Sequence, residues 1–254
     1  MAPGGPATCV NLTFAAMLVF PCAKINLGLN VVRRRADGYH DIESVLVPIP
    51  LTDALEAVVD PALPQGTTVL TRTGLGGGSS DGAHMLLLLD RLFGLRLGAE
   101  VMRTLAAQLG SDPPFFLHHG PCLAEGRGEH LTPLALSLEE LWLVLVDPGI
   151  HVSTAEVYAR TRPSGTSVDL RSILAGPIDS WQGRLINGME EAVFTLHPAI
   201  GRIKRALLEA GARYASMSGS GSSVFGLFTE RPRFEPLTFG APHWTLPLGA
   251  GQQA

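Results

Sequence analysis

Polar and hydrophobic residues alternate along residues 24–32, whose sequence is KINLGLNVV. The apolar positions share one side of this segment and the polar positions share the other: Ile25, Leu27, Leu29 and Val31 against Lys24, Asn26 and Asn30. A period of two residues predicts a half-buried strand. We therefore expect Lys24 and Asn26 to lie together on the face that points away from the core.

Similar patterns recur along the rest of the chain. They predict strands over residues 43–49, 54–59, 67–71 and 141–146, and a terminal strand through Phe228. Helical periods predict helices over residues 81–93 and 98–109, and further helices from Ser153 and from Pro198. Because strands and helices are mixed and the turn signals are antiparallel in type, we expect an α+β fold.

Two helix starts and one helix face carry more specific expectations. In the helix over 98–109, Val101, Leu105 and Leu109 are expected to face inward. Ser153 and Glu156 have the spacing of a capping box. Asp112 is followed by two prolines, which is typical of an N-cap and a first helical turn.

The composition indicates a folded chain with a substantial core. Hydrophobic residues make up 46% of the 254 positions and charged residues only 17%. This length allows one large domain or two small ones. We expect a boundary near residues 135–150, with an N-terminal domain over 17–140 and a C-terminal domain over 141–240.

Charge and cysteine usage narrow the possible partners. The net charge is −4, which does not favour binding to nucleic acid. The one basic cluster, residues 33–35, is typical of a solvated turn. No apolar run approaches the roughly 20 residues of a membrane helix. Three cysteines without regular spacing, Cys9, Cys22 and Cys122, predict reduced thiols in a cytoplasmic protein.

Residues 1–16 precede the first well-patterned segment. They are apolar but contain no Lys or Arg, so they lack the positively charged region of a signal peptide. Met17 opens the run MLVFP directly before the strand over 24–32. We expect Met17 to be the true start residue and residues 1–16 to be a dispensable, non-native extension.

A glycine-rich loop at residues 74–80 (GLGGGSS) is the strongest chemical signal. Consecutive glycines let the backbone approach a ligand closely, and the predicted helix that follows presents free N–H groups and a positive dipole end. The loop is therefore interpreted as a phosphate cradle, although it matches neither the P-loop nor the dinucleotide-binding pattern. The alternative is a flexible linker, which is seldom placed between a strand and an apolar helix.

Other candidate residues are ambiguous when each is taken alone. Asp112 is more often only an N-cap, Lys24 only a solvated strand charge, and Tyr39–His40 only surface residues after a turn. His118 and His119 are adjacent and point apart, so no metal-ligating residues are predicted. A second glycine-serine loop, residues 218–222, is by itself typical of a hairpin turn. Two such loops in one chain favour a common polyanionic ligand.

Taken in order, the motifs resemble those of the GHMP kinases. They are residues 21–29 (PCAKINLGL), 37–40 (DGYH), 74–81 (GLGGGSSD), 110–116 (GSDPPFF) and 216–222 (SMSGSGS). The first two resemble one branch of the family, whose members use ATP to phosphorylate the 2-hydroxyl of 4-diphosphocytidyl-2-C-methyl-D-erythritol. The resemblance covers about residues 18–229. It implies a ribosomal-protein-S5-like N-terminal domain and a ferredoxin-like C-terminal domain, with the active site between them.

The resemblance also implies roles for individual residues. Lys24 and Asp112 would form the catalytic pair, and ATP would bind with Mg²⁺. The ATP-binding residues would be Thr73, Gly74, Leu75, Gly76, Gly77, Gly78, Ser79 and Ser80. The substrate-binding residues would be Asn26, Tyr39, His40, Ser153, Thr154 and Tyr158. The expected partner is this small molecule, without nucleic acid or membrane, for a monomer or homodimer.

The chain departs from the family pattern before the glycine-rich loop. Only about fifteen residues separate the strand over 54–59 from this loop, where the family carries several dozen more. We expect that a strand, a helix and part of the adenine pocket are absent, which would expose apolar surface on the helix over 81–93. Two further interpretations stay open: a catalytically impaired protein of the same fold that still binds nucleotide or substrate, and an unrelated structural protein.

Overall fold

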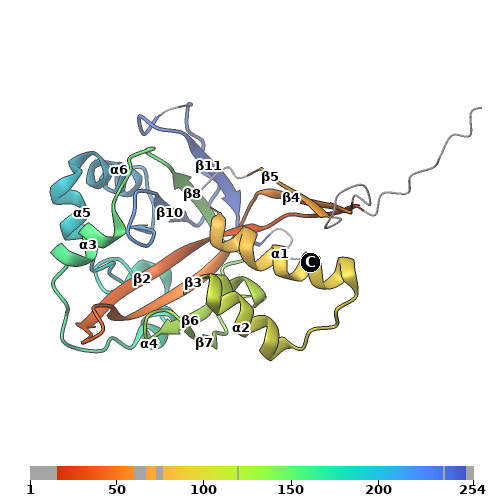
Figure 1. Cartoon of the computed structure of the whole chain (residues 1–254). Coiled ribbons are helices and arrows are strands. Elements are labelled where there is room, and N and C mark those ends of the chain that lie inside the picture. Colours follow the sequence, from red (N-terminus) through yellow and green to blue (C-terminus); the bar gives the residue numbers. More distant parts are fainter. Residues whose placement is uncertain (1–15, 60–66, 73–76, 119, 237, 250–254) are drawn as a thin grey trace, which may run out of the picture.

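A computed structural model of the chain describes residues 16–59, 67–72, 77–118, 120–236 and 238–249. Within these residues, the strands form three antiparallel sheets (Figure 1). One sheet has the order β1 (Ala16–Val19), β4 (Ala54–Val59), β5 (Thr67–Arg72). The next has the order β2 (Cys22–Arg34), β3 (His40–Thr52), β6 (Cys122–Glu125), β7 (His130–Pro133). The last has the order β11 (His243–Pro247), β8 (Trp142–Val146), β10 (Val224–Phe228), β9 (Tyr214–Met217).

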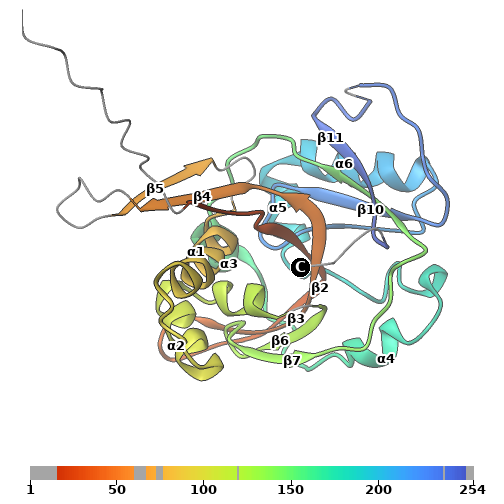
Figure 2. The ribbon, with the colours of Figure 1, turned by 90° about the vertical axis from the view of Figure 1, so that its right-hand side faces the viewer.

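Helices cover the outer faces of these sheets. They are α1 (Gly78–Phe93), α2 (Ala99–Leu109), α3 (Thr154–Arg160), α4 (Leu170–Leu174), α5 (Glu190–Leu196) and α6 (Pro198–Glu209), with short 3₁₀ helices η1 (Pro113–Leu117) and η2 (Ile178–Ser180). Helices α1 and α2 lie on one side of the long β2–β3 hairpin, and the sheet of β8 to β11 lies on the other (Figure 2). The predicted α+β class is thereby confirmed.

The period of two along the strands decides which elements pack together. Val45 and Val47 of β3 join Ile25 and Leu27 of β2 in a core that also contains Leu143 of β8 and Tyr214 of β9. Leu46, between the two valines, points the other way and packs with Phe115 and Phe116 of η1. The β2–β3 hairpin is therefore covered on both faces, and the two halves of the chain share one core. The division at residue 140 stays a prediction.

A β-bulge in β2 changes the phase of this pattern. The register shifts between Leu27 and Leu29, and Gly28 between them has φ +69°, a conformation that favours glycine. A Cβ at Gly28 would also lie 2.7 Å from Leu185. After the bulge, Leu29 and Val31 face a second core cluster, together with Ile200, Ile203 and Leu207 of α6.

Helix α1 does not have the exposed apolar face that the short segment before it led us to expect. Leu88 is fully buried against Leu55 and Ala57 of β4, and Met17 and Val19 of β1 complete this cluster. Exposure of a large hydrophobic residue is confined to the end of the helix, at Phe93, which is 48% exposed. The sheet of β1, β4 and β5 thus supplies the cover. Residues 1–15 lie outside the described residues, so the start at Met17 stays a prediction.

The predicted inward face of α2 is wrong. Met102 and Ala106 are buried, whereas Val101 and Leu109 are 49% and 57% exposed. The helical period was recognised correctly, but its phase was set by the most apolar residues rather than by those that meet α1 and η1. Elements that no pattern indicated are β1, β6, β7, β11, α4 and α5.

The core beneath α6 gives a prediction about stability. Leu207→Ala removes a fully buried side chain from the cluster between α6 and the third sheet. We expect the free energy of unfolding to fall by about 2–5 kcal/mol, because the cavity adds to the lost burial. Chemical denaturation of both proteins measures this difference. A change well below 1 kcal/mol would show that this packing is wrong.

Candidate active site

Lys24 and Asp112, which are far apart in the sequence, meet between β2 and η1. Lys24 and Asn26 lie on the same face of the hairpin as Leu46, which packs against η1. The Nζ atom of Lys24 is 3.4 Å from Oδ2 of Asp112, just before η1. The Asp112 side chain makes no capping hydrogen bond, so the simple N-cap interpretation is wrong and the carboxylate is available to Lys24.

Asn26 extends this polar group into the protein. Its Oδ1 accepts a hydrogen bond of 2.7 Å from Lys24 Nζ, and its Nδ2 donates to Ser44 Oγ at 2.9 Å. The Ser44 hydroxyl in turn donates to the carbonyl of Gly28 at the bulge. Asn26 is only 3% exposed, so the expectation that it lies on an open face of the strand needs correction. It shares a face with Lys24, but that face is covered.

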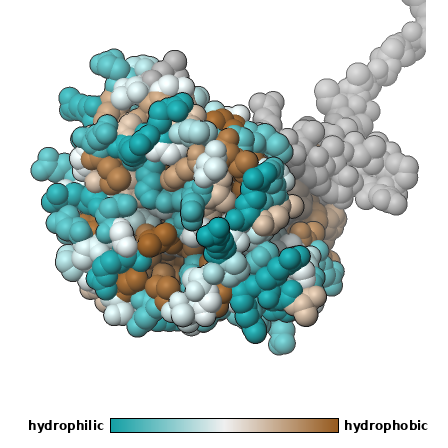
Figure 3. Space-filling model, turned by 90° about the vertical axis from the view of Figure 1, so that its left-hand side faces the viewer, coloured by the Kyte–Doolittle hydropathy of each residue, from teal (hydrophilic) through white to brown (hydrophobic). Residues whose placement is uncertain are grey.

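A cavity of about 970 Å³ lies in front of these residues. Residues from the predicted site line it, namely Lys24, Asn26, Tyr39, His40, Asp112, Thr154 and Tyr158. Arg34, Arg127 and the loop residues Gly219 and Ser220 also contribute to its wall. The lining is therefore mixed, with cationic and aromatic groups around one acid. The molecular face in Figure 3 is largely hydrophilic, with small separate hydrophobic patches.

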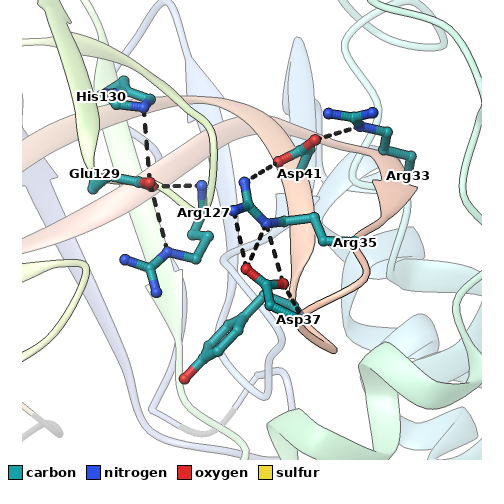
Figure 4. Close-up of polar contacts among 8 residues, drawn as sticks. Arg33, Arg35, Asp37, Asp41, Arg127, Glu129 and His130 are labelled. Atoms are coloured by element: carbon teal, nitrogen blue, oxygen red, sulfur yellow. Dashed lines mark hydrogen bonds and ion pairs between the residues drawn. The ribbon is translucent and has the colours of Figure 1, made fainter.

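Tyr39 and His40 follow the turn of the β2–β3 hairpin, as Asp37–Gly38 predicted. Gly38 has φ +87°, and Asp37 accepts a hydrogen bond from the Tyr39 N–H. Arg35 holds both Asp37 and Asp41, as Figure 4 shows, and this lowers the pKa of both carboxyl groups. The Arg127 guanidinium lies 5.1 Å from the centre of the Tyr39 ring. The turn is thus fixed by charge pairs at its base.

His40 and Tyr158 form an aromatic stack at one end of the cavity. Their ring centres are 4.8 Å apart and their planes differ by 20°. Burial, with a smaller contribution from the charge of Arg34, lowers the pKa of His40, so its ring is neutral near pH 7. Burial and the negative charge of Asp112 raise the pKa of Tyr158. Both rings are therefore uncharged surfaces suited to a planar ligand.

Only part of the predicted ATP loop can be placed. Thr73, Gly74, Leu75 and Gly76 lie outside the described residues. Gly77 precedes α1, and Gly78, Ser79 and Ser80 form its first turn, so the helix begins earlier than predicted. Ser80 is buried, and its hydroxyl donates to the carbonyl of Cys22 at 2.6 Å, two residues before Lys24. The start of α1 is thereby attached to the strand that carries Lys24.

The second glycine-serine loop, residues 218–222, lies between Asn26 and α3. The Ser218 Oγ accepts a hydrogen bond of 3.3 Å from the Asn26 N–H, and Ser220 Oγ is 2.9 Å from Thr154 Oγ1. Ser153 is not part of the cavity wall; its Oγ accepts from the Glu156 N–H and caps α3, as the capping-box spacing predicted. Sequence reasoning missed Ser44, Arg34 and Arg127, whose local patterns are those of ordinary strand and turn residues.

Two family models match the chain: the GHMP kinases N terminal domain over residues 55–120 and GHMP kinases C terminal over residues 174–235. The 4-diphosphocytidyl-2-C-methyl-D-erythritol kinase of Parabacteroides distasonis is 40% identical, over 86% of this chain and 94% of that protein. The protein with the same name in Azobacteroides pseudotrichonymphae is 43% identical, over 84% and 93%. Both relatives are therefore matched over nearly their whole length.

The length of the match bears on the missing segment. The alignment with the P. distasonis protein spans 255 residues, whereas 86% of this 254-residue chain is about 218 residues. The relative therefore carries about 37 residues in this span for which the chain has no counterpart. This difference agrees in size with the segment that the sequence predicts to be absent.

Solved structures give the same assignment. A crystal structure of 4-(cytidine 5'-diphospho)-2C-methyl-D-erythritol kinase superposes with a TM-score of 0.75 and 30% identity, over 92% of this chain and all of that chain. A homoserine kinase from Cytophaga hutchinsonii, at 17% identity and a TM-score of 0.60, shares the fold. The chain belongs to the GHMP kinases and, within them, to the family of 4-diphosphocytidyl-2-C-methyl-D-erythritol kinases.

Proposed function

We propose that the chain transfers the γ-phosphoryl group of ATP to the 2-hydroxyl of 4-diphosphocytidyl-2-C-methyl-D-erythritol, in the route to isopentenyl diphosphate. The observation that carries this proposal is the Lys24–Asp112 pair, which lies in one cavity with the stacked rings of His40 and Tyr158. A proton acceptor and a cation at one part of a cavity and a flat aromatic surface at another match a substrate that joins a hydroxyl to a nucleobase.

In this proposal, Asp112 is the proton acceptor. Its carboxylate takes the proton of the 2-hydroxyl while that oxygen forms a bond to the γ-phosphorus of ATP. The bond from the γ-phosphorus to the bridging oxygen breaks, and ADP leaves with its electron pair. Lys24 keeps Asp112 ionised and stabilises negative charge that develops on the transferred group. Positioning and electrostatic stabilisation account for most catalysis in such reactions.

The cytidine end of the substrate is assigned to the aromatic residues. Tyr39 and Tyr158 supply ring faces on which a base can stack, and the neutral ring of His40 supplies a hydrogen bond. In the ligand-free protein, His40 itself covers Tyr158. Binding of the base by this ring therefore requires His40 to turn aside. Asn26 and Thr154 lie between the two ends and are assigned to the methylerythritol part.

ATP is assigned to the glycine-rich segment over 73–80. The first N–H groups of α1 and its positive dipole end favour phosphate oxygens. Gly77 leaves room that a side chain would fill, since a Cβ there would lie 2.5 Å from Asp53. The loop over 218–222 contributes two cavity residues, Gly219 and Ser220, from the opposite side. The two glycine loops would thus face the phosphates of both ligands.

Mg²⁺ is expected to accompany ATP. In the described part of the chain, no group of three or more His, Cys, Asp or Glu residues could hold a metal ion. Mg²⁺ next to a nucleotide usually needs only one or two carboxylates besides the phosphates and water. Asp81, in the first turn of α1, fits this role because neither carboxylate oxygen has a partner in the described protein. When bound, Mg²⁺ would neutralise phosphate charge.

The remaining assignments follow from the reaction. No described helix could cross a bilayer, and both substrates are small, charged solutes, so we infer a cytoplasmic enzyme that acts as a monomer or homodimer without nucleic acid. A binding protein of the same fold without turnover is not favoured, because it would not need the Lys24–Asp112 pair. Release of ADP that depends on both substrates and on Mg²⁺ tests the whole proposal.

The first prediction concerns Asp112. Asp112→Asn keeps the size of the side chain but removes the proton acceptor, so we expect kcat to fall by about 100-fold or more. The KM values for both substrates should change much less. Steady-state ADP release measures both quantities, and isothermal calorimetry checks that the cytidine substrate still binds. An Asp112→Asn protein with wild-type turnover would exclude Asp112 as the base.

The second prediction concerns the base-binding ring. Tyr158→Ala should raise KM for the cytidine substrate about tenfold or more, because stacking on one ring contributes about 1–3 kcal/mol. Tyr158→Phe keeps the ring and serves as the matched control, with KM close to that of the wild type. The KM for ATP should be unchanged in both variants. Equal effects of alanine and phenylalanine would contradict stacking.

The third prediction concerns Asp81. Burial, and then the negative charge of Asp53, raise the pKa of Asp81, while His84 acts in the opposite direction. The folded state thus holds this proton more tightly than the unfolded state. Its stability therefore falls as pH rises from about 4 through the raised pKa.

Replacing Asp81 by Asn removes the ionisation. Without ATP or Mg²⁺, Asp81→Asn should raise the melting temperature at pH 8, and the gain should shrink toward pH 4. Thermal denaturation at several pH values, with EDTA present, measures this. A variant that melts lower than the wild type at pH 8 would show that the ionised carboxylate has a stabilising partner.

A further inference from the structure

Asn187 is a buried polar residue that belongs to none of the motifs described above. It is 1% exposed and precedes α5. Its Nδ2 group donates two hydrogen bonds of 2.8 Å, one to the carbonyl of Met217 and one to the carbonyl of Gly219. Its Oδ1 accepts from the Met189 N–H at 3.0 Å. Both donors of the side-chain amide and one lone pair of its oxygen are therefore used.

The backbone around Asn187 is joined to β2. The Leu29 N–H donates to the carbonyl of Ile186 at 2.9 Å, and the Gly188 N–H donates to the carbonyl of Leu29 at 2.7 Å. Leu29 and Asn187 form a parallel bridge at this point. Leu29 lies three residues after Asn26 on the strand that carries Lys24. The backbone at Asn187 is thus fixed to the strand that presents the proposed catalytic lysine.

The side chain of Asn187 holds a different part of the cavity wall. Met217 and Gly219 flank Ser218, whose hydroxyl accepts a hydrogen bond from the Asn26 N–H. Gly219 and Ser220 line the cavity, and Ser220 contacts Thr154 at the start of α3. Asn187 is not part of the cavity wall, so it can act on a ligand only through this loop.

A neighbouring acid supports the stem of the same loop. Glu190, at the start of α5, accepts hydrogen bonds from the Ser216 hydroxyl and the Met217 N–H, and it pairs with Lys204 of α6. These contacts fix the end of β9 against α5 and α6. The turn of the loop, beyond Met217, is held from below by Asn187. Glu190 and Asn187 therefore have separable effects on stem and turn.

We propose that Asn187 is a positioning residue for phosphoryl transfer, which holds the Ser218–Ser222 loop at a fixed place relative to β2. One amide then sets how the Lys24 and Asn26 side of the cavity lies relative to the Thr154 side. This role rests on the proposed function. It follows from the direction of the bonds, since both donors of a fully buried side chain go to carbonyls of a cavity loop. Losing them leaves both carbonyls without this donor and lets the loop move.

The test uses the full chain with two substitutions. Asn187→Asp keeps the volume and the acceptor for Met189 but loses both donors, and Asn187→Ala removes the side chain. Leu207→Ala is the matched control, because it destabilises the same half of the protein without touching the loop. We measure the melting temperature, kcat and both KM values well below the melting range, and amide hydrogen exchange of the peptide that contains Gly219.

Both Asn187 variants should lose about tenfold or more in kcat, because small displacements in an active site are costly, while the KM values change less. Hydrogen exchange of the loop should accelerate in both. The Leu207→Ala control should lose thermal stability but keep kcat within about twofold. A kcat close to that of the wild type in the Asn187 variants, or a loss no larger than in the control, would overturn the role of Asn187.

Two further arms keep the outcomes separate. If the Asn187 variants do not fold, Ser218→Ala tests the same connection from the loop side and should lower kcat. Unchanged kcat in that variant would then overturn the proposal. Wild-type turnover of the cytidine substrate tests the assignment beneath it. A wild-type chain without turnover would contradict the proposed function, whereas an active wild type with fully active variants would contradict only the role of Asn187.

Discussion

The alternation of β2 determines where almost every functional group of this protein lies. On one face of the strand, Ile25 and Leu27 enter the core that the two halves of the chain share. On the other, Lys24 and Asn26 turn toward η1 and meet Asp112. A slip of one residue would exchange the two faces, so the same hydrophobic burial that stabilises the fold also places the proposed catalytic lysine.

The Lys24–Asp112 contact itself contributes little to stability. The Asp112 side chain is 46% exposed and the two atoms are 3.4 Å apart, and ion pairs open to solvent are worth about 1 kcal/mol or less. Its placement depends instead on apolar packing: Leu46 against Phe115 and Phe116 holds η1 on the hairpin. The pair is therefore organised by the core, and remains open to a ligand that replaces water around the carboxylate.

Sequence reasoning succeeded where the structure is decided locally. The period of two over 24–32, the Asp37–Gly38 turn and the capping box at Ser153 each depend on neighbouring residues, and each was found. The inward face of α2 was wrong because its phase is set by contacts with α1 and η1, not by the most apolar side chains. Short strands such as β6 have too few residues to show a period.

The site was predictable only to the extent that its motifs are contiguous. Lys24 and Asp112 were found through their segments, and the structure then placed them together. Asn187 was missed because its contacts come from Met217 and Gly219, thirty and thirty-two residues away, and a lone asparagine before a helix has many ordinary uses. Arg127 was missed for the same reason, since its contact with Tyr39 exists only after the sheet forms.

The shortened segment before the glycine-rich loop tests how much of the fold the reaction needs. Relatives carry about 37 more residues in the matched span, yet Leu88 of α1 is fully buried here by β1 and β4. The hydrophobic demand of α1 is thus met without them, and so is the attachment of its first turn through Ser80 to Cys22. The phosphate end of the ATP site depends on that first turn and on β2, both of which are retained. The cost of the shorter segment therefore falls on the part of ATP farthest from the transferred group, where lost contacts weaken binding but leave the geometry at Lys24 and Asp112 intact.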